Sequence, residues 1–149
     1  MIKIICVGKI KHSFIKEGIE EYKKRLQKFT KLEIIEINDY EYNEPNKTLK
    51  KEMEEILKHI NIKDNIVILD IKGTQLNSKK FSKIIENNIA NKTTFVIGGS
   101  YGIHEEIKQM ANYKISFSEL TFPHQMFRLI FLEQVYRAFK IINNQTYHK

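Results

Sequence analysis

Five side chains capable of acid–base or anion-binding chemistry gather in the C-terminal third of the chain. His124, Arg128 and Arg137 lie in a long helix-like run, and Tyr147 and His148 lie in the terminal Tyr-His-Lys tail. His124 and Arg128 are four residues apart, which places them on one side of a helix. An imidazole can exchange a proton near neutral pH, and a guanidinium can hold an anion. We therefore expect these groups to surround one ligand.

Structural roles for the same residues stay open at this point. The start of a helix disfavours positive charge, so a neutral imidazole is expected at His124. Glu133 and Arg137 have the spacing of an intrahelical ion pair, which in an otherwise apolar helix favours steadying an interface over reaction. A lone histidine is more often structural than catalytic, so the grouping carries the hypothesis rather than any single residue.

A glycine-rich segment is a second candidate site. Gly98-Gly99-Ser100-Tyr101-Gly102 follows an apolar run, and glycine lets a ligand approach the backbone closely. No Gly-Lys-Ser/Thr follows, and the Gly-Gly-x-x-Gly spacing differs from the dinucleotide fingerprint, so a plain tight turn is the alternative. Further on, the segment from Phe117 to Phe122 mixes apolar and hydroxyl side chains. It could enclose an adenine and a ribose, or simply connect two elements.

Apolar runs and amphipathic repeats alternate along the whole chain. Strands are predicted at 2–7, 32–37, 66–71, 93–97 and near 113–116, and helices at 13–29, about 49–60, 77 or 78 to 89, 104–110 and after Pro123. This alternation predicts one α/β domain over residues 1–149 with a mainly parallel sheet. Such sheets bind ligands beyond the C-terminal ends of their strands, here after Asp70, Ile97 and Ser116. Asp70 itself either caps a neighbouring loop or contacts a ligand.

The last predicted helix carries more apolar surface than one small domain needs. Its apolar residues, from Met126 to Ile142, cover almost every side of a helix. A helix that is apolar all round is buried all round, so one side is expected to meet the core of the domain and the other a second copy of the chain. Several charges in mid-segment exclude a membrane span. The sequence therefore predicts a homodimer.

Composition limits the classes of partner. The net charge of +7 favours an anionic partner such as RNA or DNA, with a merely solvated basic surface as the alternative. One predicted helix face carries such cations, namely Lys16, Lys23, Lys24, Arg25 and Lys28. The single cysteine, Cys6, lies in an apolar run and is expected in the core, so we expect neither a disulfide nor a zinc site. Without a signal-peptide pattern at the N-terminus, a cytoplasmic protein is expected.

Several segments taken together and in order resemble one known family. They are Ile97 to Gly102, Ser116 to Gln125, Glu133 to Ile141 and the terminal Tyr147-His148-Lys149. This combination resembles the RlmH (YbeA-type) branch of the SPOUT methyltransferases. The opening strand and the IVILDIKG segment fit as well, so the resemblance extends over essentially the whole chain.

The resemblance implies a fold and a reaction that composition does not. The implied fold is an α/β knot, a deep C-terminal trefoil knot that general topology rules disfavour. The implied reaction moves a methyl group from S-adenosylmethionine to N3 of a pseudouridine in 23S ribosomal RNA of the assembled ribosome, carried out by a homodimer. By position, the cofactor contacts carry over to Leu69, Gly98, Phe117, Ser118, Glu119, Leu120, Thr121 and Phe122.

Catalytic roles can be assigned as a hypothesis within that reaction. The N3 proton must leave before or during attack, and a base with a pKa near neutral suits that task. His148 or His124 is expected to take this proton or to orient the base, with Tyr147 beside His148 in the tail. Arg128 and Arg137 are expected to hold a phosphate or the developing oxyanion. The alternatives are a basic RNA-binding homodimer without catalysis, and a nucleotide-binding hydrolase or dehydrogenase, which the missing motifs count against.

Overall fold

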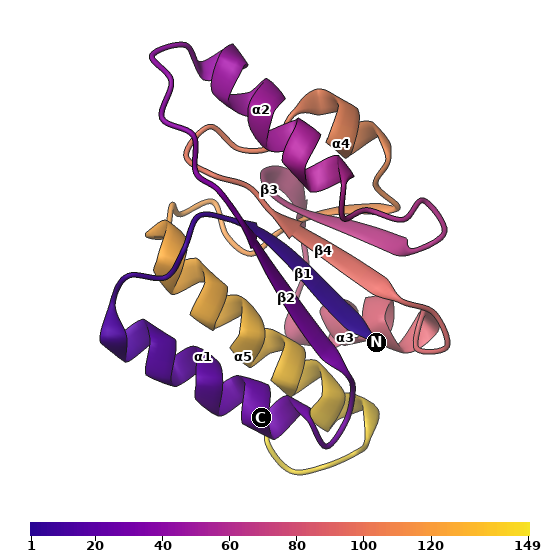
Figure 1. The fold of residues 1–149 in the computed structure, drawn as a ribbon. Coiled ribbons are helices and arrows are strands. Elements are labelled where there is room, and N and C mark those ends of the chain that lie inside the picture. Colours follow the sequence, from indigo (N-terminus) through magenta and orange to yellow (C-terminus); the bar gives the residue numbers. More distant parts are fainter.

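A single parallel sheet with helices on both faces forms the fold of the computed structural model, which describes all 149 residues (Figure 1). The strand order is β2-β1-β4-β3-β5, and every neighbouring pair is parallel. The strands are β1 (Ile2–Val7), β2 (Leu32–Ile37), β3 (Asn65–Gln75), β4 (Thr93–Ile97) and β5 (Tyr113–Ser116). The helices are α1 (Ser13–Leu26), α2 (Pro45–Leu57), α3 (Ser78–Asn87), α4 (Glu105–Gln109) and α5 (His124–Ile142). The predicted α/β class and parallel sheet are confirmed.

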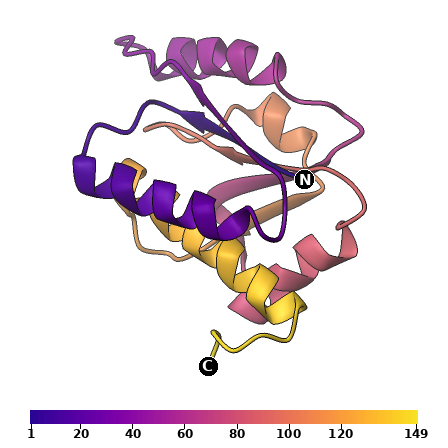
Figure 2. The same ribbon diagram turned by 60° about the horizontal axis from the view of Figure 1, so that its bottom comes forward.

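Two apolar clusters cover the two faces of the sheet. Helices α1, α3 and α5 pack on one face, and α2 and α4 pack on the other, as the two views show (Figure 2). Alternate residues of β1 point to opposite clusters, with Ile4 and Cys6 on one side and Ile5 and Val7 on the other. Both sets are fully or almost fully buried. A strand buried on both faces needs no polar alternation, which explains the continuous apolar runs.

Helix α5 lies between α1 and α3 and is fixed to the sheet by aromatic packing. The ring centroids of Phe131 and Phe95 are 4.9 Å apart. Gly18 of α1 lies so close to α5 that a Cβ there would stand 2.9 Å from the side chain of Leu129. One side of α5 is thus buried in the chain's own core, whereas Met126 is 37% exposed on another side. Coverage of that side by a second copy stays a prediction, as does the knotted threading of the chain.

Several element boundaries differ from the predictions for local reasons. β3 continues to Gln75 instead of ending near residue 71, because the chain departs from β5 after Leu69 and pairs with it again at Thr74. Gly73 permits this return, since a Cβ there would lie 2.7 Å from the backbone of Ile115. α2 begins at Pro45 rather than near the predicted start at residue 49, because proline suits the first turn of a helix.

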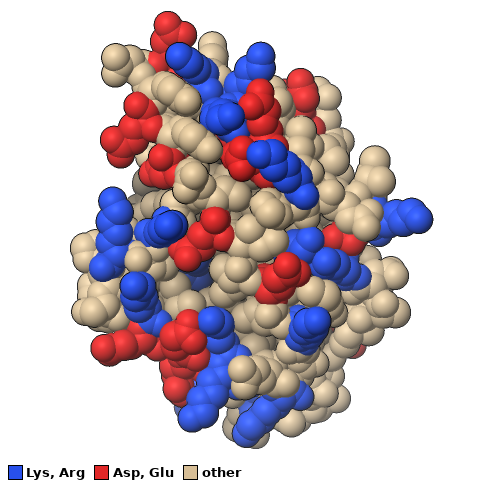
Figure 3. Space-filling view, viewed as in Figure 1, with Lys and Arg blue, Asp and Glu red and all other residues tan.

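Positive and negative side chains are mixed on one face of the molecule, where Figure 3 shows Lys and Arg interspersed with Asp and Glu. Lys23 and Arg25 of the predicted cationic helix face pair with Glu20 and Glu21 at 2.7 and 2.9 Å. Two of the five cations of that face are therefore neutralised locally. No helix combines the length and apolar character needed to cross a membrane, and no group of three His, Cys, Asp or Glu side chains is placed to hold a metal ion.

Candidate functional site

A cavity of about 330 Å³ opens at the C-terminal ends of β3, β4 and β5. Seven of the eight expected cofactor residues line it, namely Leu69, Gly98, Phe117, Ser118, Leu120, Thr121 and Phe122. They meet because the carboxyl ends of parallel strands lie at one edge of the sheet. The eighth, Glu119, is exposed and does not line the cavity. It follows Ser118 in a tight turn, where Ser118 Oγ accepts a hydrogen bond from the Leu120 amide at 3.0 Å.

The glycine-rich segment contributes backbone rather than side chains to this cavity. It turns back on itself, with the Gly102 amide donating to the Gly99 carbonyl at 3.0 Å. A Cβ at Gly98 would lie 2.3 Å from the Gly102 carbonyl oxygen, so no other residue fits there without moving the turn. Gly102 has a φ of +83°, a conformation that favours glycine. The glycine-rich segment is therefore a tight turn and also forms part of the cavity wall.

Asp70 at the cavity edge is engaged by its own surroundings. Its carboxylate lies 2.9 Å from Lys108 Nζ and accepts a hydrogen bond from the Lys72 amide at 3.2 Å. Burial opposes the charged form, but these two donors outweigh it and hold the pKa of Asp70 below its usual value. Asp70 thus both caps the loop and remains charged beside the cavity.

A second cavity of about 590 Å³ adjoins the first. The two share four lining residues, Ile115, Ser116, Phe117 and Phe122. Its remaining walls come from the start of α3, the middle of α5 and the C-terminal tail, which Figure 2 shows turning back below α5. His148 lines this second cavity, whereas His124 lines the first. The two imidazoles therefore face different cavities with a common wall, and the expectation that they surround one ligand stays a prediction.

The tail is held by a network that joins three of the predicted catalytic residues. Arg137 Nη2 and Nε donate to Glu133 Oε1 at 2.6 and 3.1 Å, and the Tyr147 hydroxyl donates to the same oxygen at 3.0 Å. Arg137 Nη1 lies 3.3 Å from His148 Nδ1. A guanidinium only donates, so Nδ1 accepts, and the proton of the neutral imidazole is on Nε2. Burial, followed by hydrogen bonds involving Tyr22 and Glu133, raises the pKa of Tyr147, so its hydroxyl stays protonated.

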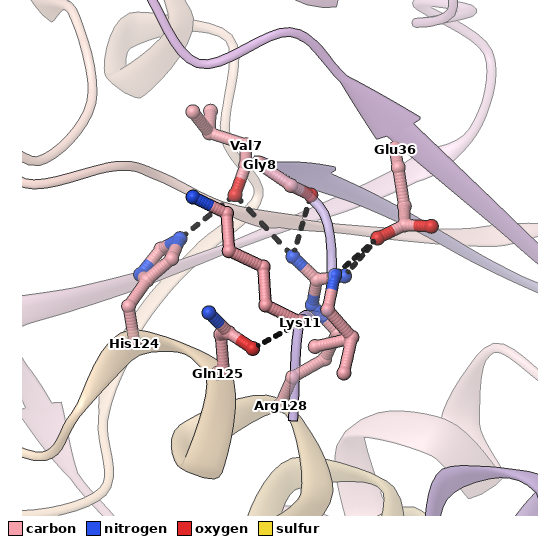
Figure 4. A network of polar contacts seen from close by, with 8 residues as sticks. Val7, Gly8, Lys11, Glu36, His124, Gln125 and Arg128 are labelled. Carbon is pink, nitrogen blue, oxygen red and sulfur yellow. Dashed lines mark hydrogen bonds and ion pairs between the residues drawn. The ribbon is translucent and has the colours of Figure 1, made fainter. Parts of the chain in front are cut away.

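The other two predicted catalytic residues lie at the opposite end of α5 and fasten the helix to β1 (Figure 4). Arg128 is 2% exposed and donates to Glu36 Oε2 at 2.7 Å and to the carbonyls of Gly8 and Val7 at 2.9 and 3.3 Å. It lines neither cavity, so the expected anion-binding role is corrected to a structural one. His124 Nε2 lies 2.8 Å from the Val7 carbonyl and therefore donates to it.

Glu52 is a buried ionisable residue that the sequence analysis missed. It is 3% exposed, and a Cβ added to Gly99 would stand 3.1 Å from its Oε1. Burial first, and then the nearby charge of Asp39, raise the pKa of Glu52 to about 7. A signal was present: Glu52 falls between Leu49, Met53 and Ile56 on the apolar stripe of its helix. The carboxyl lies against Gly99, which lines the first cavity, but Glu52 itself lines neither cavity.

Removing the buried guanidinium is predicted to destabilise the fold. Arg128→Met should lower the free energy of unfolding by about 2–4 kcal/mol, because two backbone carbonyls and a carboxylate lose their donor. Glu36 is 36% exposed on its side chain and can be hydrated, which limits the loss. Urea unfolding at fixed protein concentration measures the change. Arg25→Met, which removes an exposed ion pair, should cost much less than Arg128→Met. Equal stability of the Arg128 variant and the natural chain would contradict the structural role.

Glu52 is predicted to make stability depend on pH. Its pKa is raised from 4.5 in the ordinary state to about 7 in the folded state, so the folded protein binds this proton more tightly. Stability should therefore fall as pH rises from about 5 to 8, by on the order of 1–3 kcal/mol from this group. Glu52→Gln, which stays uncharged, should lack that component, whereas Glu54→Gln on the exposed side of α2 should retain it. Unfolding curves at several pH values test this, and parallel profiles for both variants would refute it.

Comparisons with known proteins give the chain a family. A family described as "Predicted SPOUT methyltransferase" matches residues 1–148. The "Ribosomal RNA large subunit methyltransferase H" of Caldicellulosiruptor saccharolyticus is 50% identical over 154 residues, with all of both chains covered. The protein of the same name from Clostridium botulinum (strain Langeland) is 50% identical over 158 residues, with 99% of each chain covered.

A solved structure has a similar fold. It is described as a probable methylase family protein from Haemophilus influenzae, with a TM-score of 0.52, and covers 99% of this chain and 70% of the other. At 15% identity this likeness concerns the fold alone. The family match over residues 1–148 and the 50% identity to two relatives over essentially the full chain lead to the same assignment. The chain belongs to the SPOUT methyltransferase family.

Proposed function

We propose that the protein transfers a methyl group from S-adenosylmethionine to N3 of a pseudouridine in 23S ribosomal RNA, acting on the assembled ribosome. The observation that carries the proposal is the 50% identity, over the full length of both chains, to a protein named as a ribosomal RNA large subunit methyltransferase. The adjoining cavities at the strand ends support it, because methyl transfer needs a donor and an acceptor side by side.

The first cavity suits the cofactor. Gly98 lines the cavity with backbone alone, Leu69 and Phe122 offer apolar surfaces for an adenine, and the hydroxyls of Ser118 and Thr121 suit a ribose. Leu120 is 72% exposed at the mouth, where a ligand would cover it. S-adenosylmethionine supplies an electrophilic methyl group on a sulfonium when bound. The protein's part is to hold this group and exclude water from it.

Residues of the tail suit the acceptor side of the reaction. The N3–H of the base lies between two carbonyls, and its loss spreads negative charge over both oxygens. His148 Nε2–H would donate to one of these oxygens and orient the base, while its Nδ1 accepts from Arg137. The guanidinium charge of Arg137 favours the anionic base, and the proton passes to solvent. His124, committed through Nε2 to the Val7 carbonyl, would hold the strand end instead.

The proposed assembly is a homodimer in the cytoplasm, where ribosomes are found. Its interface would use the uncovered side of α5, which includes the 37% exposed Met126, together with Phe14, 58% exposed, on the neighbouring helix α1. Exposed apolar side chains on neighbouring helices are typical of such contacts. The knotted C-terminal segment is part of the same proposal, which family membership supports.

The proposed reaction is predicted to be measurable on ribosomes that lack the modification. The purified protein with labelled S-adenosylmethionine should incorporate about one methyl group per ribosome, because a base-specific site accepts one target. Nuclease digestion and mass spectrometry should locate the label on N3 of one pseudouridine. Free ribosomal RNA is the control and should be a poor substrate. If the folded protein binds the cofactor yet leaves ribosomes unmethylated, the assignment fails; if it does not bind the cofactor, the RNA-binding alternative gains.

Removal of the tail is predicted to separate binding from turnover. A chain ending at Thr146 loses the Tyr147 and His148 groups but none of the residues lining the first cavity. The dissociation constant for S-adenosylmethionine and the oligomeric state should stay near normal, while kcat falls at least about 100-fold through loss of a positioned polar group. Calorimetry, light scattering and the ribosome assay give the three values. A tail-less protein with full activity would remove His148 from the mechanism.

A further inference from the structure

We propose that the second cavity, between α3 and α5, receives the target nucleotide, and that Ser78 and Gln134 read the edge of its base. This inference rests on the proposed function and deepens it. The cavity has a volume of about 590 Å³, which falls in the range of small-molecule sites and suits one nucleotide rather than a duplex. A nucleotide bound there would have left its base stack, as enzymes that modify bases generally require.

The walls of the cavity divide into an aromatic side and a polar side. Phe81, Phe117 and Phe122 form the aromatic side, and the rings of Phe81 and Phe117 pack edge to face at 5.7 Å. Phe117 and Phe122 also line the cofactor cavity, so a base against them lies next to the methyl donor. Aromatic rings accept any base face, and they therefore supply affinity without choice among bases.

Choice among bases must come from the polar side. Ser78 Oγ donates to Gln134 Oε1 at 2.8 Å, and Gln134 Nε2 donates to Glu133 Oε2 at 2.8 Å. One hydrogen on Nε2 and the lone pairs of Ser78 Oγ remain unused. These are one donor and one acceptor, on two side chains that are hydrogen-bonded to each other. In pseudouridine the ring N1 carries a hydrogen next to the C2 carbonyl, whereas in uridine N1 carries the sugar. The donor and the acceptor therefore complement this edge of pseudouridine. Against the same edge of uridine the acceptor would stay unpaired.

The polar pair is joined to the tail through Glu133. The same carboxylate group accepts from Gln134, Arg137 and Tyr147, and Arg137 contacts His148, which lines the same cavity. Gln134, which would read one edge of the base, and His148, which would orient the base, are therefore both linked to the Glu133 carboxylate. Lys79 is exposed at the rim and can meet a backbone phosphate.

Nucleotide binding tests the cavity without turnover. Protein saturated with S-adenosylhomocysteine is titrated with pseudouridine 5′-monophosphate and with uridine 5′-monophosphate, and side-chain resonances are followed by NMR. The Gln134 amide should shift with the pseudouridine nucleotide, and uridine should bind about tenfold more weakly because one buried acceptor stays unpaired. Gln134→Leu and Ser78→Ala should abolish this preference. Gln109→Leu, an exposed glutamine on α4 across the sheet, is the matched control and should keep it.

Kinetics on unmodified ribosomes provide the second test. Gln134→Leu should lower kcat/KM about tenfold while the cofactor dissociation constant stays within about twofold, since the pair contacts only the base. Weaker cofactor binding with unchanged ribosome kinetics would mean that the cavity holds part of the cofactor, and would overturn the inference. Absence of any nucleotide shift at the cavity would overturn it too. Selective nucleotide binding without ribosome methylation would support the cavity while refuting the proposed function.

Discussion

The position of α5 relative to the sheet is the constraint on which both cavities depend. A buried guanidinium at one end, Arg128, fastens the helix to Glu36 and to the carbonyls at the end of β1. Such a charge is expensive to bury, and it is tolerated because its two terminal nitrogens make three hydrogen bonds to oxygens, although Nε has no partner. Further along, Phe131 packs on Phe95 of the sheet. The helix therefore cannot slide or rotate without breaking one of these contacts.

This fixed helix supplies walls to both cavities from different turns. His124 and Phe127, near its start, face the first cavity, and Ile130 and Gln134, two turns on, face the second. The next turn carries Arg137, which with Glu133 holds the tail through two part-buried hydrogen bonds, to His148 and from Tyr147. Such hydrogen bonds contribute little free energy each, so we expect the tail to be held less firmly than the start of α5. The order along α5 thus runs from a rigid anchor to a part that can be displaced by a ligand.

Sequence reasoning reached the fold class and most of the first cavity because both follow from the order of elements. Parallel strands bring their carboxyl ends together, so Gly98 and the segment from Phe117 to Phe122 had to be neighbours. Residue roles on α5 were harder, since spacing gives the side of a helix but not what that side meets. His124 and His148 were grouped by sequence proximity, yet they face different cavities. Glu52 was missed because acidic residues are usually exposed, although its place on the apolar stripe of α2 indicated burial.

The wall common to both cavities gives the proposed reaction its simplest physical account. Displacement at a sulfonium methyl needs the entering nitrogen in line with the leaving sulfur, and little else. Phe117 is held in place by Phe81, Phe127 and Phe131, with ring centroids 5.2 to 5.9 Å away, so a surface that touches both ligands is itself rigid. Donor and acceptor that pack on opposite parts of such a surface are aligned by the fold, without a moving lid. In this view Arg137 favours the deprotonated base and His148 orients it. The aromatic core of the domain sets the distance over which the methyl group travels.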